Sequence, residues 1–396
     1  MRIAFFTNNY LPNTGGAAIA VESYKEALEK LGHEVHVFAP KYPPWFPKYK
    51  DDMGKKIRRF PSLFLKIITP QPIPIPFPFI VEKYFRSQNF DIVHSHHPFV
   101  IGKTALILAK KYKTPIVFTH HTLYHKYVHY IPLIPQSITS KIAIFESVRY
   151  ANQVDLVIAP TPEVKEMITE FGVKTKIEVI PTGIDLSLWE KPVPADFLHG
   201  KPWINKKILL YTGRLAKEKS IDFLINALSQ ILKQREDTVL LIVGEGEERE
   251  NLEKLVSNLE LNNKVFFLGW YPREELIYFY NIADIFVFSS TTETQGLVTL
   301  EAMAGECAIV AIKATGSISL VEDGEEGFLT EQNFEDFAQK VQLLLNNDTL
   351  LNQMKIKAKK RARELSIEKS AEKLSELYCE IIKNKEKFSK ITKNSK

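Results

Sequence analysis

Two glutamates, Glu293 and Glu301, are spaced so that they could bind the two ends of one extended polar ligand. Glu293 lies in a polar loop, and Glu301 lies about two turns into the helix expected to follow it. At 1.5 Å per helical residue their carboxylates can be up to roughly 12 Å apart, about the distance from a sugar across a diphosphate to a ribose. The N–H groups of Gln295, Gly296 and Leu297 open this helix and are expected to point at an anion. Either glutamate alone could equally be a solvated acid near a helix terminus, and the pair is the stronger indication.

An arginine and a lysine follow an earlier apolar strand. Arg214 stays charged at physiological pH and can bind oxygens in two-pronged fashion, while Lys219 adds a point charge. At a strand's carboxyl end and the start of a helix, this pair is typical of a diphosphate clamp. The alternative is a pair of basic residues on the surface.

Two adjacent glycines, Gly15 and Gly16, lie between a strand near the start of the chain and the following helix. Without a Cβ atom, the backbone here can approach a phosphate or a sugar. Many strand-to-helix turns use glycine for backbone reasons alone, and the three spaced glycines of a dinucleotide-binding loop are missing. The pair is a candidate ligand-binding loop.

Three histidines follow two further apolar strands: His96 comes after the first, and His120 and His121 come after the second. A histidine at a strand end is often a structural hydrogen-bonding residue, so that role and a binding role both stay open. Acids or cysteines at zinc-ligand spacing do not accompany them, so we expect neither a metal site nor another cofactor.

The elements that must position these residues alternate between buried strand and amphipathic helix, as in doubly wound α/β sheets. In such sheets ligands bind at the carboxyl ends of the strands, against the first turn of the next helix. With 396 residues the chain is too long for one ordinary core and fits two domains. The expected strands are 3–7, 34–39, 90–95, 115–119, 155–159, 177–180, 207–212, 239–243, 265–270, 283–290 and 307–312, and the expected helices include 17–31, 102–111 and the region from 333 onward.

Composition excludes several classes of protein. The chain is 45% hydrophobic and 25% charged, which is ordinary for a globular protein. A net charge of +5 is too small to imply nucleic acid, and no nucleic-acid-binding motif appears. Cys307 and Cys379 are the only cysteines, which favours a reducing compartment. Because the chain starts on a strand without a signal peptide, and no apolar run reaches the roughly 18 residues of a membrane span, we expect a cytoplasmic protein.

The segment from Glu293 to Glu301 resembles the Glu, seven residues, Glu signature of retaining nucleotide-sugar glycosyltransferases of family 4. The resemblance extends over nearly the whole chain. The glycine loop, Thr-His-His-Thr at 119–122 and the Arg214 segment are similar to family motifs, although Ser220 stands where the family has glycine. Pro-Thr-Gly-Ile-Asp at 181–185 is similar to the family's Pro-Asn-Gly-Ile-Asp junction.

The resemblance implies a GT-B fold of two facing, doubly wound Rossmann-like domains with parallel sheets. It implies an acceptor-binding domain at 1–188 plus a C-terminal helix at about 370–396, and a nucleotide-sugar-binding domain at 189–369. The implied roles place His121, with His120 as second choice, beside the transferred sugar, Glu293 on sugar hydroxyls, Glu301 on ribose hydroxyls, and Arg214 and Lys219 on the diphosphate. Such a retaining, front-face reaction needs charge stabilisation rather than a metal ion.

Two further features favour a lipid acceptor such as diacylglycerol. Residues 41–79 mix basic side chains with Trp, Phe and many prolines, which suits either an anionic membrane surface or an insertion packed on its own domain. Their alternating prolines exclude helix and central strand. Residues 123–132, and the Thr-Glu-Thr-Gln-Gly-Leu form of the main motif, are similar to those of diacylglycerol glucosyltransferases. We therefore expect glucose transfer from UDP-glucose to a lipid, with peripheral contact at the inner face of the cell membrane as a further expectation.

Other functions stay open. Phosphatidylinositol mannosyl transfer and transfer to a soluble sugar or polysaccharide fit the same motifs. A sugar-nucleotide epimerase or phosphorylase on the same architecture, and a non-catalytic binding module, belong to other classes. Hydrolytic release of sugar without an acceptor would identify an epimerase, and a binding module would not turn over the donor.

Overall fold

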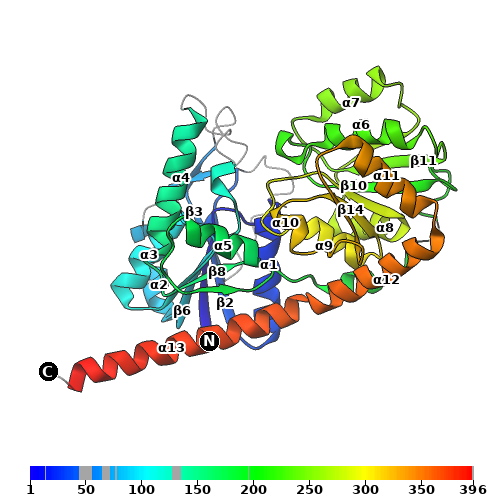
Figure 1. Cartoon of the computed structure of the whole chain (residues 1–396). Helices are drawn as coiled ribbons and strands as arrows, with labels where there is room; N and C mark the ends of the chain where they lie inside the picture. Colours follow the sequence, from blue (N-terminus) through cyan, green and yellow to red (C-terminus); the bar gives the residue numbers. More distant parts are fainter. Residues whose placement is uncertain are drawn as a thin grey trace. The chain divides into compact units, whose positions relative to one another are not determined.

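The computed structural model describes residues 1–13, 15–43, 56–64, 72–75, 78–126, 135–194 and 196–394. Several residues of the predicted lipid surface, Trp45, Phe46, Lys55 and the segment 127–134, lie outside the described residues. The chain forms two compact units (Figure 1). The first consists of Met1–Gly183 and Ile367–Lys396, and the second of Ile184–Ser366.

The first unit is built on a seven-stranded parallel sheet with the strand order β3-β2-β1-β6-β7-β8-β9. Its strands are short apolar runs, and residues 3–6 in β1 are fully buried, because helices cover both faces of the sheet. The strands that match expected ones are β1 (Arg2–Phe6), β2 (Glu34–Pro40), β6 (Ile92–Ser95), β7 (Ile116–Thr119), β8 (Leu156–Ala159) and β9 (Ile177–Val179).

Helices form two layers around this sheet. One layer contains α1 (Gly16–Lys30) and α13 (Ile367–Asn394), which share an apolar core with one face of β1 and β2. The other contains α2 (Pro78–Gln88), α3 (Ile101–Tyr112), α4 (Gln136–Ala151) and α5 (Pro162–Glu170), which pack on the opposite face. The C-terminal helix, the long orange-to-red helix of Figure 1, therefore completes the core of the first unit.

The segment 41–79 contains regular structure that sequence patterns did not indicate. β3 (Ile57–Phe60) adds an edge strand parallel to β2, and β4 (Ser62–Leu63) and β5 (Ile73–Pro74) form a small antiparallel pair. α2 begins at Pro78, in the first helical turn where proline's missing N–H costs no hydrogen bond. The prediction that prolines exclude helix from this segment was therefore wrong at its end.

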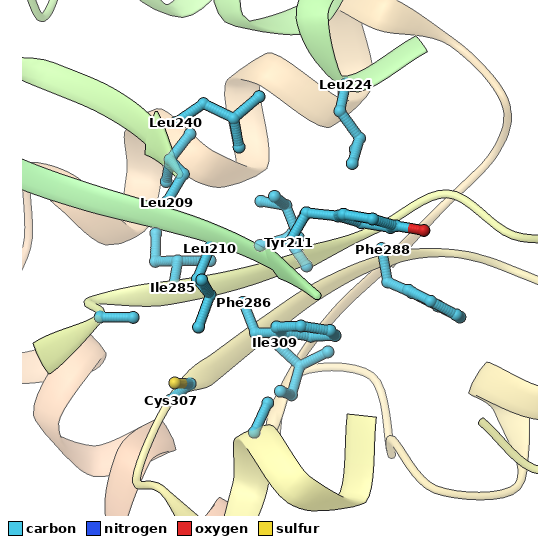
Figure 2. Close-up of a cluster of buried hydrophobic side chains, with 14 of the residues drawn as sticks. Leu209, Leu210, Tyr211, Leu224, Leu240, Ile285, Phe286, Phe288, Cys307 and Ile309 are labelled. Atoms are coloured by element: carbon cyan, nitrogen blue, oxygen red, sulfur yellow. The ribbon is translucent and has the colours of Figure 1, made fainter. Parts of the chain in front are cut away.

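The second unit holds a six-stranded parallel sheet in the order β12-β11-β10-β13-β14-β15. Helices α6, α7 and α11 pack together, as do α8, α9 and α12, around a single apolar core, part of which is shown in Figure 2. The strands are β10 (Lys207–Thr212), β11 (Thr238–Val243), β12 (Val265–Gly269), β13 (Ile285–Phe288), β14 (Ala308–Ile312) and β15 (Gly327–Thr330). The helices are α6 (Ile221–Ile231), α7 (Arg249–Asn258), α8 (Arg273–Ile282), α9 (Leu297–Ala304), α10 (Thr315–Ile318), α11 (Phe334–Leu345) and α12 (Asp348–Glu364).

The order of strands reverses beside the first strand of each sheet. β1 pairs with β2 on one side and β6 on the other, and β10 pairs likewise with β11 and β13. Loops that leave neighbouring strands in opposite directions open a crevice at the carboxyl ends, which is where open parallel sheets bind ligands. The candidate residues that follow β1, β6, β10 and β13 therefore lie at these switch points.

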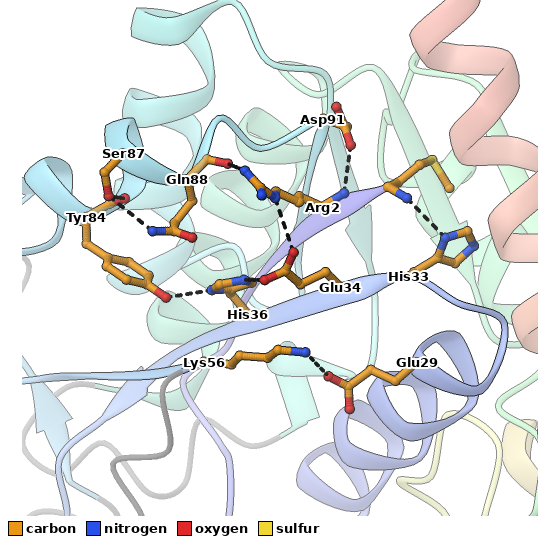
Figure 3. Close-up of polar contacts among 11 residues, drawn as sticks. Arg2, Glu29, His33, Glu34, His36, Lys56, Tyr84, Ser87, Gln88 and Asp91 are labelled. Atoms are coloured by element: carbon orange, nitrogen blue, oxygen red, sulfur yellow. Dashed lines mark hydrogen bonds and ion pairs between the residues drawn. The ribbon is translucent and has the colours of Figure 1, made fainter.

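Charged pairs connect residues at the amino-terminal ends of the strands of the first sheet, opposite the carboxyl ends that bear the candidate residues (Figure 3). Arg2 Nε lies 3.1 Å from one oxygen of Glu34, whose other oxygen lies 3.0 Å from Nε2 of His36. Lys56 Nζ lies 3.3 Å from the carboxylate of Glu29 in α1. These residues stabilise the edge of the fold. Within the described parts of the chain, no helix is long and apolar enough to cross a membrane.

Candidate functional site

The switch point of the second unit brings Glu293 and Lys219 together. Their side chains form an ion pair, with 24% of the Glu293 side chain and 13% of the Lys219 side chain exposed. The Ser289 hydroxyl, just after β13, donates to the carbonyl oxygens of Lys219 and Ser220 at 2.8 and 2.9 Å. The end of β13 therefore holds the loop after β10 and keeps a cation beside a carboxylate.

Arg214 begins the same loop. Its Nη2 donates to the buried carboxylate of Glu218, and its Nη1 lies 3.8 Å from Glu247. The Tyr211 hydroxyl donates to the Arg214 carbonyl oxygen at 3.2 Å, which fixes the backbone of the turn. With 39% of its side chain exposed, Arg214 offers a fixed positive charge at the carboxyl end of β10.

Glu301 lies on α9 in a mostly buried polar cluster. The Tyr280 hydroxyl donates to its Oε2 at 3.0 Å, and Arg273 Nε lies 3.5 Å from its Oε1. Burial raises the pKa of Glu301, while Arg273 and Tyr280 act in the opposite direction. The Tyr280 hydroxyl also lies 2.5 Å from that of Thr212 at the end of β10. Glu301 is thus a positioned acceptor for hydroxyl groups.

The loop between Glu293 and Glu301 is shaped by two glycines. Gly296 is the N-cap of α9 and has φ of +77°, a left-handed conformation that favours glycine. α9 begins at Leu297, so Glu301 lies just over one turn into the helix and not the two turns predicted, and Gln295 before the helix is buried. A Cβ on Gly316, in the short helix α10 after β14, would lie 2.7 Å from Glu293 Cβ, so α10 packs directly on the candidate acid.

The histidines lie at the carboxyl ends of β6 and β7, and β6 borders the switch point of the first unit. His96 and His97 follow β6, and His120 and His121 follow β7. His96 Nδ1 and His121 Nε2 are 2.9 Å apart, and the Asn8 N–H donates to His97 Nδ1 at 3.3 Å. Burial lowers the pKa of His97 and His120 to about 4, and the pKa values of His96 and His121 well below the usual 6.5. All four rings are therefore neutral near pH 7.

The glycine loop follows β1 at the same switch point. Gly15 is the N-cap of α1, with φ of −66°, a value that any residue adopts, and both Gly15 and Gly16 are exposed. The Gly15 N–H donates to Asn13 Oδ1 at 2.9 Å. Backbone strain therefore does not require glycine at position 15, and access to the backbone remains the physical reason for it.

Two family models match the chain, one described as Glycosyltransferase Family 4 over residues 14–188 and one as Glycosyl transferases group 1 over residues 199–361. The chain is also 30% identical over 406 residues to the alpha-monoglucosyldiacylglycerol synthase of Acholeplasma laidlawii, covering 98% of this chain and 100% of that relative. The chain belongs to glycosyltransferase family 4.

One further relative has the same name, and another is named for a different sugar. The alpha-monoglucosyldiacylglycerol synthase of Streptococcus pneumoniae is 31% identical over 339 residues, which cover 78% of this chain and 71% of that protein. The GDP-mannose-dependent alpha-mannosyltransferase of Corynebacterium glutamicum is 27% identical over 343 residues, which cover 84% and 77% of the two chains.

Solved glycosyltransferase structures share the fold. Anabaena HepE, solved in complex with UDP-glucose, gives a TM-score of 0.78 at 21% identity, covering 96% of this chain and 100% of HepE. Sucrose-phosphate synthase from Thermosynechococcus elongatus gives 0.80 at 23% identity, covering 97% and 100%. The family 4 chain thus has the predicted GT-B fold and is a hexosyltransferase. Retention at the anomeric carbon is the usual outcome in this family.

Three residues of the site in this family 4 enzyme were not predicted from the sequence. Arg273 and Tyr280 of α8 contact Glu301, and Gly316 contacts Glu293. The only signal for Arg273 was its place after the Gly-Trp-Tyr-Pro turn that ends β12. Among the described residues, no group of three or more His, Cys, Asp or Glu side chains could hold a metal ion.

Proposed function

We propose that the enzyme transfers glucose from UDP-glucose to a hydroxyl of diacylglycerol, with retention at the anomeric carbon. The first unit would bind the acceptor and the second the nucleotide sugar. The observation that carries the lipid acceptor is a surface on helices α2–α4 that mixes exposed apolar and basic side chains. The full-length similarity to synthases named for monoglucosyldiacylglycerol supports the same choice.

The residues of the second unit suit a nucleotide diphosphate sugar. Arg214 and Lys219 would stabilise the charge that develops on the leaving diphosphate, and the first turn of α9 would add backbone N–H donors. Glu301 would accept hydrogen bonds from the ribose hydroxyls. Glu293, released from Lys219 as the diphosphate takes over that cation, would hold the hydroxyls of the sugar.

The neutral histidines suit the other side of the transferred sugar. His121 would contact the sugar, and Gly15 and Gly16 would leave space beside it. A neutral ring can hydrogen-bond a hydroxyl without placing a positive charge beside the positively charged anomeric carbon of the transition state. Burial keeps His121 in that neutral form, because it lowers its pKa well below 6.5.

The apolar and basic side chains of this surface come from helices α2, α3 and α4 of the first unit (Figure 1). α2 contacts α3, and Lys103 of α3 lies 2.7 Å from Glu146 of α4. Large apolar side chains on it are between 42% and 69% exposed: Phe79, Ile80, Ile107, Ile138, Ile142 and Phe145. Ile138, Ile142 and Phe145 follow the i, i+4, i+7 spacing of one helical face. A cluster of exposed apolar residues of this kind marks an interaction surface.

The charge of the same helices supports the proposal of an anionic bilayer as the partner. Their basic residues are Lys83, Arg86, Lys103, Lys110, Lys111, Lys141 and Arg149, and their only acids are Glu82 and Glu146. A bilayer accepts apolar side chains at its interface, and anionic headgroups add about 1 kcal/mol for each nearby basic residue. An enzyme with a diacylglycerol substrate needs such contact.

The structure corrects which residues of 41–79 can take part. Phe60 is fully buried, so it cannot touch a lipid. Arg59 donates to the Leu11 carbonyl oxygen at 2.9 Å, and the Arg58 guanidinium lies 3.8 Å from the centre of the Tyr84 ring. These arginines stabilise the first unit, and replacing them would disturb the fold rather than test lipid binding.

The test is a turnover assay with labelled UDP-glucose, UDP-galactose and GDP-mannose on vesicles of phosphatidylglycerol and diacylglycerol. We expect UDP-glucose to give an α-glucosyl diacylglycerol. Glucosylation of a small sugar but not of lipid would overturn the acceptor, and exclusive use of GDP-mannose would overturn the donor. The mannosyltransferase relative makes mannose transfer the second candidate.

A pair of variants tests the surface. Ile142→Ser with Phe145→Ser removes two side chains that are 53% and 65% exposed, and burial of such side chains contributes about 1.5–3 kcal/mol each. We expect at least tenfold weaker vesicle binding with unchanged UDP affinity. Ile356→Ser, at a 68% exposed isoleucine of α12 in the second unit, is the matched control and should bind vesicles normally. Normal vesicle binding by the double variant would refute the role of this surface.

A further inference from the structure

A row of imidazole rings runs through the first unit to the candidate sugar-binding histidine. His94 and His96 stack with ring centres 4.2 Å apart, and His96 and His121 stack at 5.2 Å. His94 is held from both sides, because its Nδ1 bonds the Tyr378 hydroxyl of α13 and its Nε2 lies 2.7 Å from the Thr119 hydroxyl. The ring of His96 is therefore supported by a neighbour that cannot rotate without losing two hydrogen bonds.

His96 itself is fully buried and has one strong polar contact. Its Nδ1 lies 2.9 Å from Nε2 of His121, and its backbone N–H donates to the Phe6 carbonyl oxygen at 2.8 Å. Its Nε2 is shielded from solvent, and none of the described residues offers that nitrogen a hydrogen-bond partner. Phe5 meets the ring at a steep angle, with centres 4.7 Å apart, so an aromatic side chain also borders it.

Two neutral rings can form the hydrogen bond between His96 Nδ1 and His121 Nε2 in two ways, with either ring as the donor. The contacts of His96 favour one of them. If His121 donates, the proton of His96 must lie on Nε2 as a buried N–H without an acceptor, a kind of group that is rare in folded proteins. If His96 donates from Nδ1, no N–H of His96 is left unpaired. The second arrangement makes Nε2 of His121 the acceptor and puts the proton of His121 on Nδ1.

We infer that His96 is a positioning residue that donates from Nδ1 to His121 and holds it as the Nδ1–H tautomer. The hydrogen bond made by one ring nitrogen decides which nitrogen of a histidine carries the proton. In that tautomer the proton of His121 lies on Nδ1, where it would serve as the donor to a sugar hydroxyl once the donor sugar is bound. This step rests on the proposed role of His121, whereas the tautomer itself does not.

Three variants of nearly equal shape separate a donor from an acceptor at position 96. Asparagine can place an N–H near the position of Nδ1, aspartate can only accept there when ionised, and leucine can do neither. We expect His96→Asn to keep most of the turnover. We expect His96→Leu and His96→Asp to lose about ten- to a hundredfold in kcat, the range seen when a partner of a metal-binding histidine is removed. UDP affinity, which reports on the second unit, should stay unchanged, and thermal unfolding followed by circular dichroism shows whether the first unit of each variant folds.

The tautomer is read directly from long-range ¹H–¹⁵N spectra of the wild-type enzyme with ¹⁵N-labelled histidine. We expect both His96 and His121 to appear as Nδ1–H rings, and His121 to change in His96→Leu. An Nε2–H ring at His121 in the wild type, or aspartate that restores turnover better than asparagine, would overturn the inference. His121→Ala with full turnover would instead refute the sugar-binding role and leave the spectral result intact.

Discussion

Replacing Glu301 by alanine should weaken nucleotide binding about 10- to 150-fold. Its carboxylate is held by Tyr280 at 3.0 Å and lies 3.5 Å from Arg273, with 12% of its side chain exposed. Hydrogen bonds to a charged group contribute about 1.5–3 kcal/mol, and each 1.4 kcal/mol is a factor of ten in affinity. Loss of the proposed contacts with the ribose hydroxyls therefore gives the stated range, measured by calorimetric titration with UDP.

The same substitution also costs stability, so the two effects must be separated. Alanine leaves Arg273 without its carboxylate, at a cost of about 1–3 kcal/mol, while Tyr280 keeps its contact with Thr212. Glu301→Gln retains the acceptor for Tyr280 and should fall between wild type and alanine in UDP affinity. Glu326→Gln, at another buried glutamate of the second unit that accepts the Glu322 N–H at 2.8 Å, is the matched control. It should change stability but not affinity, and wild-type UDP affinity in folded Glu301→Ala would refute the role of Glu301.

Three further outcomes are expected. Gly316→Ala should displace Glu293 and lower kcat by tenfold or more, because misplacement by about 1 Å can cost 10²-fold; unchanged kcat would contradict this. The free energy of unfolding should decrease as the pH is lowered from about 6.5 to about 4. In this range histidines are protonated in the unfolded chain, while burial keeps them neutral in the folded chain, His97 and His120 among them. Each such histidine lowers the free energy of unfolding by about 1.4 kcal/mol per pH unit. Urea unfolding curves that coincide at pH 7.5 and pH 5 would contradict this prediction. Turnover should survive EDTA, because the two cations of the donor site supply the charge; loss restored by Mg²⁺ would argue otherwise.

Most strands and the loops after them could be predicted from the sequence, because apolar runs and the turns between them are local features. β3 could not, because its four residues have no distinctive pattern and pair with β2 only in the folded sheet. β15 was missed for a similar reason: it begins at Gly327, where a Cβ would lie 1.9 Å from the Ile309 carbonyl oxygen. The need for glycine at position 327 is set by the backbone of β14 and cannot be inferred from the residues of β15 alone.

In the candidate site, too, some residues could be predicted from the sequence, whereas the contacts between them could not. Motif positions could identify Glu293, Glu301 and Lys219, but not the ion pair between Lys219 and Glu293. Arg273, which lies beside Glu301, was not identified because it comes from another element, α8. Sequence reasoning placed His96 and His121 at strand ends without indicating their contact, because that contact depends on the neighbouring positions of β6 and β7 in the sheet. The assigned roles of these residues remain predictions until the variants are measured.

The position of α13 has a consequence for how the protein is made. This helix gives Ile367, Ala371, Leu374 and Tyr378 to the core of the first unit, yet the ribosome synthesises them after the whole second unit. At about 5–20 residues per second, the N-terminal sheet waits on the order of ten seconds or more with part of one apolar face bare. Exposed apolar surface favours aggregation during that interval, and a fragment ending at Gly183 should aggregate when expressed alone.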